Sequence, residues 1–151
     1  MNTKIKWLLI GLKIDRKKIK EIEKKIGIKF PEDYIDCVVN NHGGTPKKKA
    51  YDFKDRKEAV FNRLLSYNDE SPINILKIYN LMKSYLPKYI IPFAEDPFGN
   101  NICFDYRENK SSPKVVFWDH EVAGMNPDRA IQYICESFTE LLEKLYDPDE
   151  E

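Results

Sequence analysis

The sequence predicts an α+β domain in which about four helices cover a mostly antiparallel sheet of about five or six strands. Segments near both ends of the chain repeat apolar residues at three- and four-residue spacing, which is typical of amphipathic helices. Two β-branched and aromatic runs flank a Pro/Gly/Asn turn within residues 90–106, and a third run follows at residues 115–118. Such runs between turn residues indicate consecutive strands.

The first predicted helix begins after Asp15, a favourable N-cap. Its inner face is formed by Ile19, Ile22 and Ile26, and the lysines between them face water. Gly27 fits the left-handed residue that ends a helix.

The second predicted helix opens at Pro31, because a missing N–H costs nothing at the first helical position. It ends at the pair Gly43-Gly44, and residues 45–49 are expected to form a basic loop. Its inward face is Tyr34, Cys37, Val38 and Asn41.

Residues 51–53 alternate as a short strand does, whereas residues 58–67 fit either a strand or a short helix, with a strand favoured. A third helix is predicted from Ser71-Pro72 to Leu86, where Pro87 stops it. The last predicted helix follows Asn126-Pro127-Asp128, and its inner face is Ile131, Ile134, Cys135, Phe138, Leu141, Leu142 and Leu145.

The length of 151 residues, 42% of them hydrophobic, suits a single domain over residues 1–151, with residues 147–151 as a frayed acidic tail. The apolar run at residues 7–10 is far shorter than the ~20 residues of a membrane span, and no cleavage site follows it. A cytoplasmic location is expected, and reduced, buried cysteines agree with it: Cys37, Cys103 and Cys135.

Charge is unevenly distributed, although the whole chain is neutral. Residues 1–50 contain 13 Lys/Arg against 6 Asp/Glu, a net charge of +7, and residues 101–151 contain 5 against 12, a net charge of −7. These thirds fit a nucleic-acid face, an acidic partner-binding face, or simply solvated helix surfaces.

Four motifs contain side chains or glycines that could support catalysis or ligand binding. His120 between two carboxylates could act in a hydrolase, but no nucleophile lies near it in sequence, so a turn is favoured. Oxygen ligands at Glu95-Asp96 and Asp105 match no calcium loop, and Gly43-Gly44 lacks phosphate-loop spacing. Lys47-Lys48-Lys49 beside Tyr51 and Phe53 could bind nucleic acid, yet the neutral balance argues against it.

The order of these motifs resembles the SUKH superfamily, the Smi/Knr-type domain. Residues 27–34 with 41–44 are similar to its opening, residues 91–105 to its hairpin, residues 115–121 to its next strand and turn, and residues 137–142 to its C-terminal helix. The structural positions of the resemblance are Gly27, Pro31, Tyr34, Gly43, Gly44, Pro92, Gly99, Trp118 and Phe138.

This resemblance implies a non-enzymatic protein without cofactor or metal. In bacteria, members are mostly immunity proteins that bind and neutralise a cognate polymorphic toxin, often a nuclease; a regulatory scaffold with a signalling or cell-wall partner is the alternative. The partner is expected to be a protein, with no direct nucleic-acid or membrane contact. The expected contacts are the sheet face and two acidic turns, at Glu95 and Asp96 and at Asp119 and Glu121.

Overall fold

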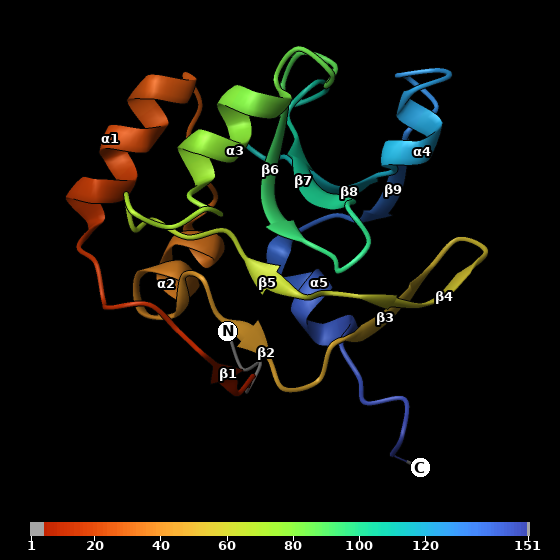
Figure 1. Cartoon of the computed structure of the whole chain (residues 1–151), viewed down its shortest axis with the longest axis horizontal. Coiled ribbons are helices and arrows are strands. Elements are labelled where there is room, and N and C mark those ends of the chain that lie inside the picture. Colours follow the sequence, from red (N-terminus) through yellow and green to blue (C-terminus); the bar gives the residue numbers. More distant parts are fainter. Residues whose placement is uncertain (1–4, 151) are drawn as a thin grey trace.

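A five-stranded antiparallel sheet forms the centre of the molecule (Figure 1). The computed structural model describes residues 5–150. The sheet has the order β5-β6-β7-β8-β9, so that each strand pairs with its neighbour in sequence. Its strands are β5 (Arg63–Leu64), β6 (Ile90–Glu95), β7 (Asn101–Asp105), β8 (Lys114–Trp118) and β9 (Ile131–Cys135).

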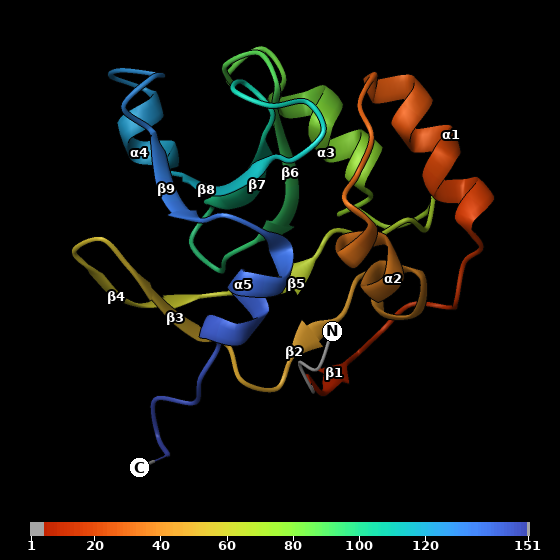
Figure 2. The same ribbon diagram turned by 180° about the vertical axis from the view of Figure 1, so that it is seen from behind.

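Five helices and two small strand pairs surround this sheet within the described residues. The pairs are β1 (Trp7–Leu8) with β2 (Thr45–Pro46), and β3 (Ala50–Phe53) with β4 (Arg56–Val60). Figure 2 shows α5 against the back of the sheet and the β3–β4 hairpin projecting below α4. The helices are α1 (Arg16–Ile26), α2 (Glu32–Asn41), α3 (Ile75–Met82), α4 (His120–Ala123) and α5 (Phe138–Lys144). The predicted α+β class is confirmed.

The alternation of side chains along the strands separates two apolar clusters on the two sheet faces. The larger cluster joins the sheet to α1, α2 and α5, and its aromatic centre is Phe30, Tyr34, Phe93, Phe104 and Phe138. The smaller cluster, beneath α4 and the end of α3, consists of Leu86, Ile90, Cys103, Val116, Trp118 and Ala130. Both sheet faces are therefore covered in part, which leaves the turns as the more accessible of the expected contacts.

The helix ends follow local chemistry. Asp15 accepts a hydrogen bond from the Lys17 backbone N–H at 3.0 Å, and Gly27 adopts φ 89° to end α1. Pro31 is the N-cap of α2, one position before the predicted one. After α2, Gly44 has no room for a side chain, because a Cβ atom would lie 2.7 Å from the Asn41 carbonyl.

Pro92 lies inside the sheet, on a strand with neighbours on both sides. Proline lacks the N–H that a ladder requires, so it is expected only at edges or bulges. The β6–β7 register shifts between Pro92 and Ala94, and β5 pairs with β6 only at Ala94 and Glu95. The bulge and the shortness of β5 therefore accommodate the proline.

The prediction of one helix from residue 131 to residue 145 is wrong. Residues 131–135 form β9, and α5 begins only after Ser137, whose hydroxyl accepts from the Glu140 N–H at 3.1 Å. The β8–β9 register shifts between Val115 and Val116, which pair with Cys135 and Tyr133. The resulting bulge buries the consecutive residues Ile134 and Cys135, so the strand shows helical spacing.

The remaining expectations on element bounds are confirmed at one segment and differ at two. The expected basic loop at 45–49 begins with β2, which pairs with the N-terminal strand β1. Helix α3 is shorter than predicted, because Asn74 caps it by accepting from the Leu76 and Lys77 N–H groups. Residues 58–67 contain the end of β4 and then β5, in agreement with the favoured strand. In the expected tail, Glu150 lies 3.4 Å from Lys48, and residue 151 is outside the described residues.

Candidate partner-binding surface

The first acidic turn is organised by Asp96. Its carboxylate is buried and accepts three hydrogen bonds of 2.8 Å, from the Phe98 N–H, the Asn100 N–H and the Asn100 side-chain amide. Gly99 completes the turn with φ 91°. The turn thus holds the Phe98 side chain outward, where it is 69% exposed.

The second acidic turn is organised by Asp119. One oxygen of its carboxylate accepts from the Glu121 and Val122 N–H groups at the start of α4, at 3.0 and 3.3 Å. The other oxygen accepts from the Arg56 guanidinium at 3.2 Å. That guanidinium also lies 4.6 Å from the centre of the Phe117 ring. Asp119 therefore joins the β3–β4 hairpin to the end of β8.

The two turns contact each other through His120. Its backbone N–H donates to the Asn100 side-chain oxygen at 3.0 Å, and a Cβ atom on Gly99 would lie 3.3 Å from its ring. Residues 95–101 and 119–121 thus form one continuous surface, which we call the acidic turn surface. Its position between β6 and α4 can be followed in Figure 1.

The four predicted contact residues divide into two kinds. Asp96 and Asp119 direct their oxygens into intramolecular hydrogen bonds, whereas Glu121 is exposed and Glu95 is half-buried. Burial raises the pKa of the Glu95 carboxyl, and the positive charge of Arg63 opposes this rise. Glu95 lines a hollow of about 410 Å³ together with Asn62, Ile78, Met82, Asp96, Pro97, Gly99, Asn100 and Asn101.

Sequence reasoning missed the apolar part of this surface. Phe98 lies on the first turn, and outside the acidic turn surface Met125, which follows α4, is 84% exposed. Exposed aromatic and methionine side chains are enriched in protein–protein interfaces. The Pro-Phe-Gly-Asn sequence could have indicated an exposed ring, because the side chain of a phenylalanine within such a tight turn cannot reach the core.

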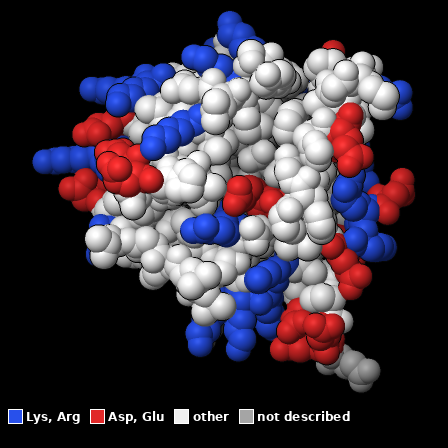
Figure 3. All heavy atoms as spheres, viewed as in Figure 1, with Lys and Arg blue, Asp and Glu red and all other residues white. Residues whose placement is uncertain are grey.

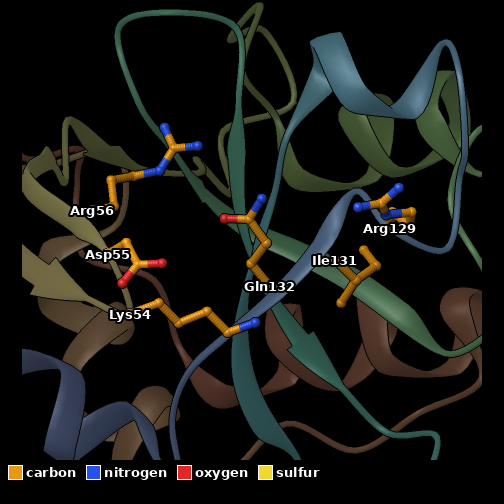
Figure 4. Close-up of a pocket in the computed structure, with 6 residues that line it drawn as sticks. All are labelled: Lys54, Asp55, Arg56, Arg129, Ile131 and Gln132. Atoms are coloured by element: carbon orange, nitrogen blue, oxygen red, sulfur yellow. The ribbon is translucent and has the colours of Figure 1, made fainter.

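A groove of about 610 Å³ separates the β3–β4 hairpin from β9 (Figure 4). Lys54, Asp55 and Arg56 form its hairpin side, and Arg129, Ile131 and Gln132 form the other. Figure 4 shows Lys54 reaching from the hairpin toward the strand of Gln132. Figure 3 shows both signs of charge side by side at this edge of the molecule, so this groove has no single sign of charge.

Within residues 5–150, the histidines and cysteines do not form a reactive cluster. His42 is buried, and its ring bonds the Leu12 carbonyl and the Tyr67 backbone N–H and lies 3.4 Å from the Ser66 hydroxyl. The His120 ring is exposed, and no hydroxyl or thiol within residues 5–150 is hydrogen-bonded to it. Burial raises the pKa of Cys37 and Cys135 to about 12 and that of Cys103 further, which makes these thiols poor nucleophiles.

Two further kinds of site are absent from the described part of the chain. Between residues 5 and 150, no three His, Cys, Asp or Glu side chains gather in a group that could hold a metal ion. No helix in that range is long and apolar enough to cross a membrane. Tyr51 and Phe53 are both buried, so they cannot form the aromatic platform for nucleic acid that the charge balance already disfavoured.

Comparison with known proteins identifies a relative of this chain and a family whose sequence pattern it matches. It is similar to the SPbeta prophage-derived uncharacterized protein YokK of Bacillus subtilis (strain 168), with 26% identity over 146 residues, 85% of this chain and 73% of the relative. The sequence pattern of the SMI1 / KNR4 family (SUKH-1) matches residues 13–144, which include every helix of the described fold. The protein therefore belongs to the SMI1 / KNR4 family (SUKH-1).

Proposed function

We propose that this protein is an immunity protein, which neutralises a cognate toxin by binding it in a stoichiometric complex. Membership of a family that includes many immunity proteins supports the proposal. A prophage-derived relative is consistent with it, since mobile elements are a setting in which toxins and their inhibitors compete. The observation on which the proposal rests is the acidic turn surface, with an exposed aromatic ring between acidic groups.

The geometry of this surface suits tight binding because it is fixed before a partner arrives. The three hydrogen bonds to Asp96 hold the first turn, and Asp119 holds the second. A preformed surface avoids the entropic cost of ordering a loop on binding. Phe98 then has the properties of an anchor residue, because aromatic side chains that become fully desolvated contribute most to interface stability.

The charges suit a basic partner, such as the nucleic-acid cleft of a nuclease toxin. Glu95 is half-buried beside the first turn and Glu121 is exposed at the second, so both can face a positive surface. Opposite potentials accelerate encounter and fix orientation. Inhibition then follows from occlusion of the cleft, with no bond made or broken.

Co-expression tests this function directly. The product of the neighbouring gene is expected to arrest growth when expressed alone, and the protein is expected to restore growth and to co-purify with that product. A toxin that is bound but remains active would favour the alternative of a regulatory scaffold. A purified protein that turns over a small molecule would refute binding as the function.

Variants locate the contact surface. Phe98→Ala should weaken toxin binding by about tenfold or more, whereas Tyr85→Ala, which removes an equally exposed ring from the end of α3, should leave it unchanged. Charge reversal at Glu95 and Glu121 should slow association and reduce its salt dependence. The control reverses Glu70 and Glu143, which are also acidic and exposed, with the same change in net charge. Equal effects of both reversals would exclude the acidic turn surface.

A further inference from the structure

The N-terminal segment 8–12 exposes consecutive apolar side chains, far from the acidic turn surface. Leu9 is 80% exposed and Leu12 is 91% exposed, and Leu8 and Ile10 are also exposed. Soluble proteins bury most leucines, so a contiguous exposed run indicates an interaction surface. In Figures 1 and 2, β1, where this segment begins, and α4 lie at opposite corners of the molecule.

These side chains are exposed although the backbone of the segment is held in place. The Gly11 N–H donates to the His42 carbonyl at 2.9 Å, and the His42 ring bonds the Leu12 carbonyl at 2.6 Å. Two residues later, the Ile14 N–H donates to Val39 at 3.1 Å. Gly11 packs so closely on His42 that a Cβ atom would lie 2.7 Å from the ring. The backbone is therefore fixed on the end of α2 with its leucines in solvent.

Leu9 adds backbone strain to this exposure. Its φ is 56°, in the left-handed region that non-glycine residues rarely adopt. A leucine held in this conformation with 80% of its surface exposed gains little from burial at that position. Strained residues of this kind cluster at functional sites, where the surrounding structure maintains them.

Lysines flank the apolar segment on both sides. Pairing of β1 with β2 brings Lys47 beside Lys6, with a backbone hydrogen bond of 2.8 Å. Lys48 and Lys49 follow in the same exposed loop, and Lys13 follows Leu12. Of these five, only Lys48 forms an ion pair with another described residue, Glu150. Figure 3 shows uncharged surface over β1 and basic side chains gathered at the lower edge beside it.

We propose that this surface, Leu8–Leu12 with its flanking lysines, docks on anionic phospholipid at a membrane surface. Aliphatic side chains that enter the acyl boundary, combined with lysines that face the headgroups, are the elements of peripheral membrane binding. A protein partner fits less well, because its contact residues are enriched in Trp, Tyr and Arg and depleted in lysine. Nucleic acid fits less well because Tyr51 and Phe53 are buried and cannot stack on bases.

This proposal is independent of the proposed toxin binding and uses a different surface. It departs from the expectation of no membrane contact, which was based on the lack of a spanning segment. Surface docking requires no such segment. A protein held at the membrane in this way would still present its acidic turn surface to a partner.

Vesicle sedimentation with the full chain tests the proposal. The protein should bind vesicles of phosphatidylcholine and phosphatidylglycerol in equal parts, should not bind phosphatidylcholine alone, and should dissociate at high salt. The Lys47→Glu/Lys49→Glu variant should lower partitioning by more than the about fivefold expected from loss of one lysine at an anionic surface. Lys77→Glu/Lys83→Glu on and after α3 makes the same charge change elsewhere and should have little effect.

Leu9→Ser/Leu12→Ser tests the apolar contribution and should weaken binding by about tenfold or more. Leu81→Ser/Tyr85→Ser is the matched control, since both side chains are exposed on another surface. An unchanged urea midpoint shows that the leucine variant remains folded. Absence of binding to the anionic vesicles, or equal binding to neutral ones, would overturn the proposal. Loss of toxin inhibition in the leucine variant, without any vesicle binding, would instead assign this surface to the protein partner.

Discussion

Replacement of His42 by alanine would test how the fold holds its N-terminal segment. The ring is 1% exposed and connects three parts of the chain. Its Nδ1 accepts from the Tyr67 backbone N–H at 3.0 Å, and its Nε2 lies 2.6 Å from the Leu12 carbonyl. Because Nδ1 is an acceptor, a neutral ring has its proton on Nε2 and donates it to Leu12.

The magnitude follows from the groups left without partners. In His42→Ala, the Tyr67 N–H and the Leu12 C=O both lose their hydrogen bonds, at about 1–3 kcal/mol for each group that stays buried. Loss of the ring's packing against Gly11 and Tyr67 adds to this. We expect the free energy of unfolding to fall by about 3–5 kcal/mol, a large share of the 5–15 kcal/mol typical of a domain.

Urea unfolding followed by tryptophan fluorescence measures this change, and His120→Ala is the control. The His120 side chain is exposed, and its ring has no hydrogen bond to any residue between 5 and 150, so its loss should cost less than about 0.5 kcal/mol. His42→Asn keeps an acceptor for Tyr67 but loses the bond to Leu12, and should fall between wild type and alanine. Equal midpoints for His42→Ala and His120→Ala would refute the role given to the buried ring.

The other predictions concern buried groups. Asp96→Ala should lower the free energy of unfolding by about 2–4 kcal/mol, and Glu95→Ala by less than about 1 kcal/mol, measured by urea unfolding, because only Asp96 accepts three bonds. Tyr34 and Tyr67 share a buried hydroxyl–hydroxyl bond of 2.8 Å, so either Tyr→Phe change alone should destabilise more than the double change; additive losses would contradict this. The pKa values of three thiols are raised, so these thiols stay protonated in the folded state, whereas in the unfolded chain they ionise from about pH 9: Cys37, Cys103 and Cys135. The free energy of unfolding should therefore fall as pH rises from 9 to 12, by roughly 1.4 kcal/mol per pH unit for each thiol. Replacement of the three cysteines by alanine should remove this part of the pH dependence.

Much of the fold could be predicted because local chemistry and tertiary packing agree. Asp15 and Gly27 delimit α1 as their side-chain and backbone preferences require. The hairpin of β6 and β7 follows from two apolar runs around Asp96-Pro97-Phe98-Gly99. The error at β9 has a physical cause, because a bulge reproduces helical spacing in a strand. The capping pattern from Ser137 to Glu140 could have located the true start of α5.

The candidate site could be predicted only at the level of its turns. Sequence alone does not show that Asp119 faces Arg56, since 63 residues separate them and the contact depends on how the hairpin packs. Nor does it show that Asp96 is buried while the adjacent Glu95 is half-accessible. Both aspartates belong to Asx-type turns, where a short carboxylate prefers nearby backbone N–H groups. Because of that preference, an aspartate in a tight turn is expected to stabilise the turn, whereas a neighbouring glutamate is the better candidate for contact with a partner.

The distinction between side chains that are bonded within the molecule and side chains that are free to contact a partner also applies to the uneven distribution of charge along the chain. Several carboxylates of the acidic part of the chain are already paired within the molecule: Asp105 lies 2.9 Å from Arg107, and Asp119 lies 3.2 Å from Arg56. Four of the five lysines that flank segment 8–12, by contrast, have no ion-pair partner among residues 5–150. A charged side chain that is accessible and unpaired is available to a binding partner. A charged side chain in an intramolecular ion pair mainly fixes the position of its neighbour. The lysines beside segment 8–12 therefore form a basic surface whose charge is largely uncompensated within the described residues, and it is separate from the acidic turn surface.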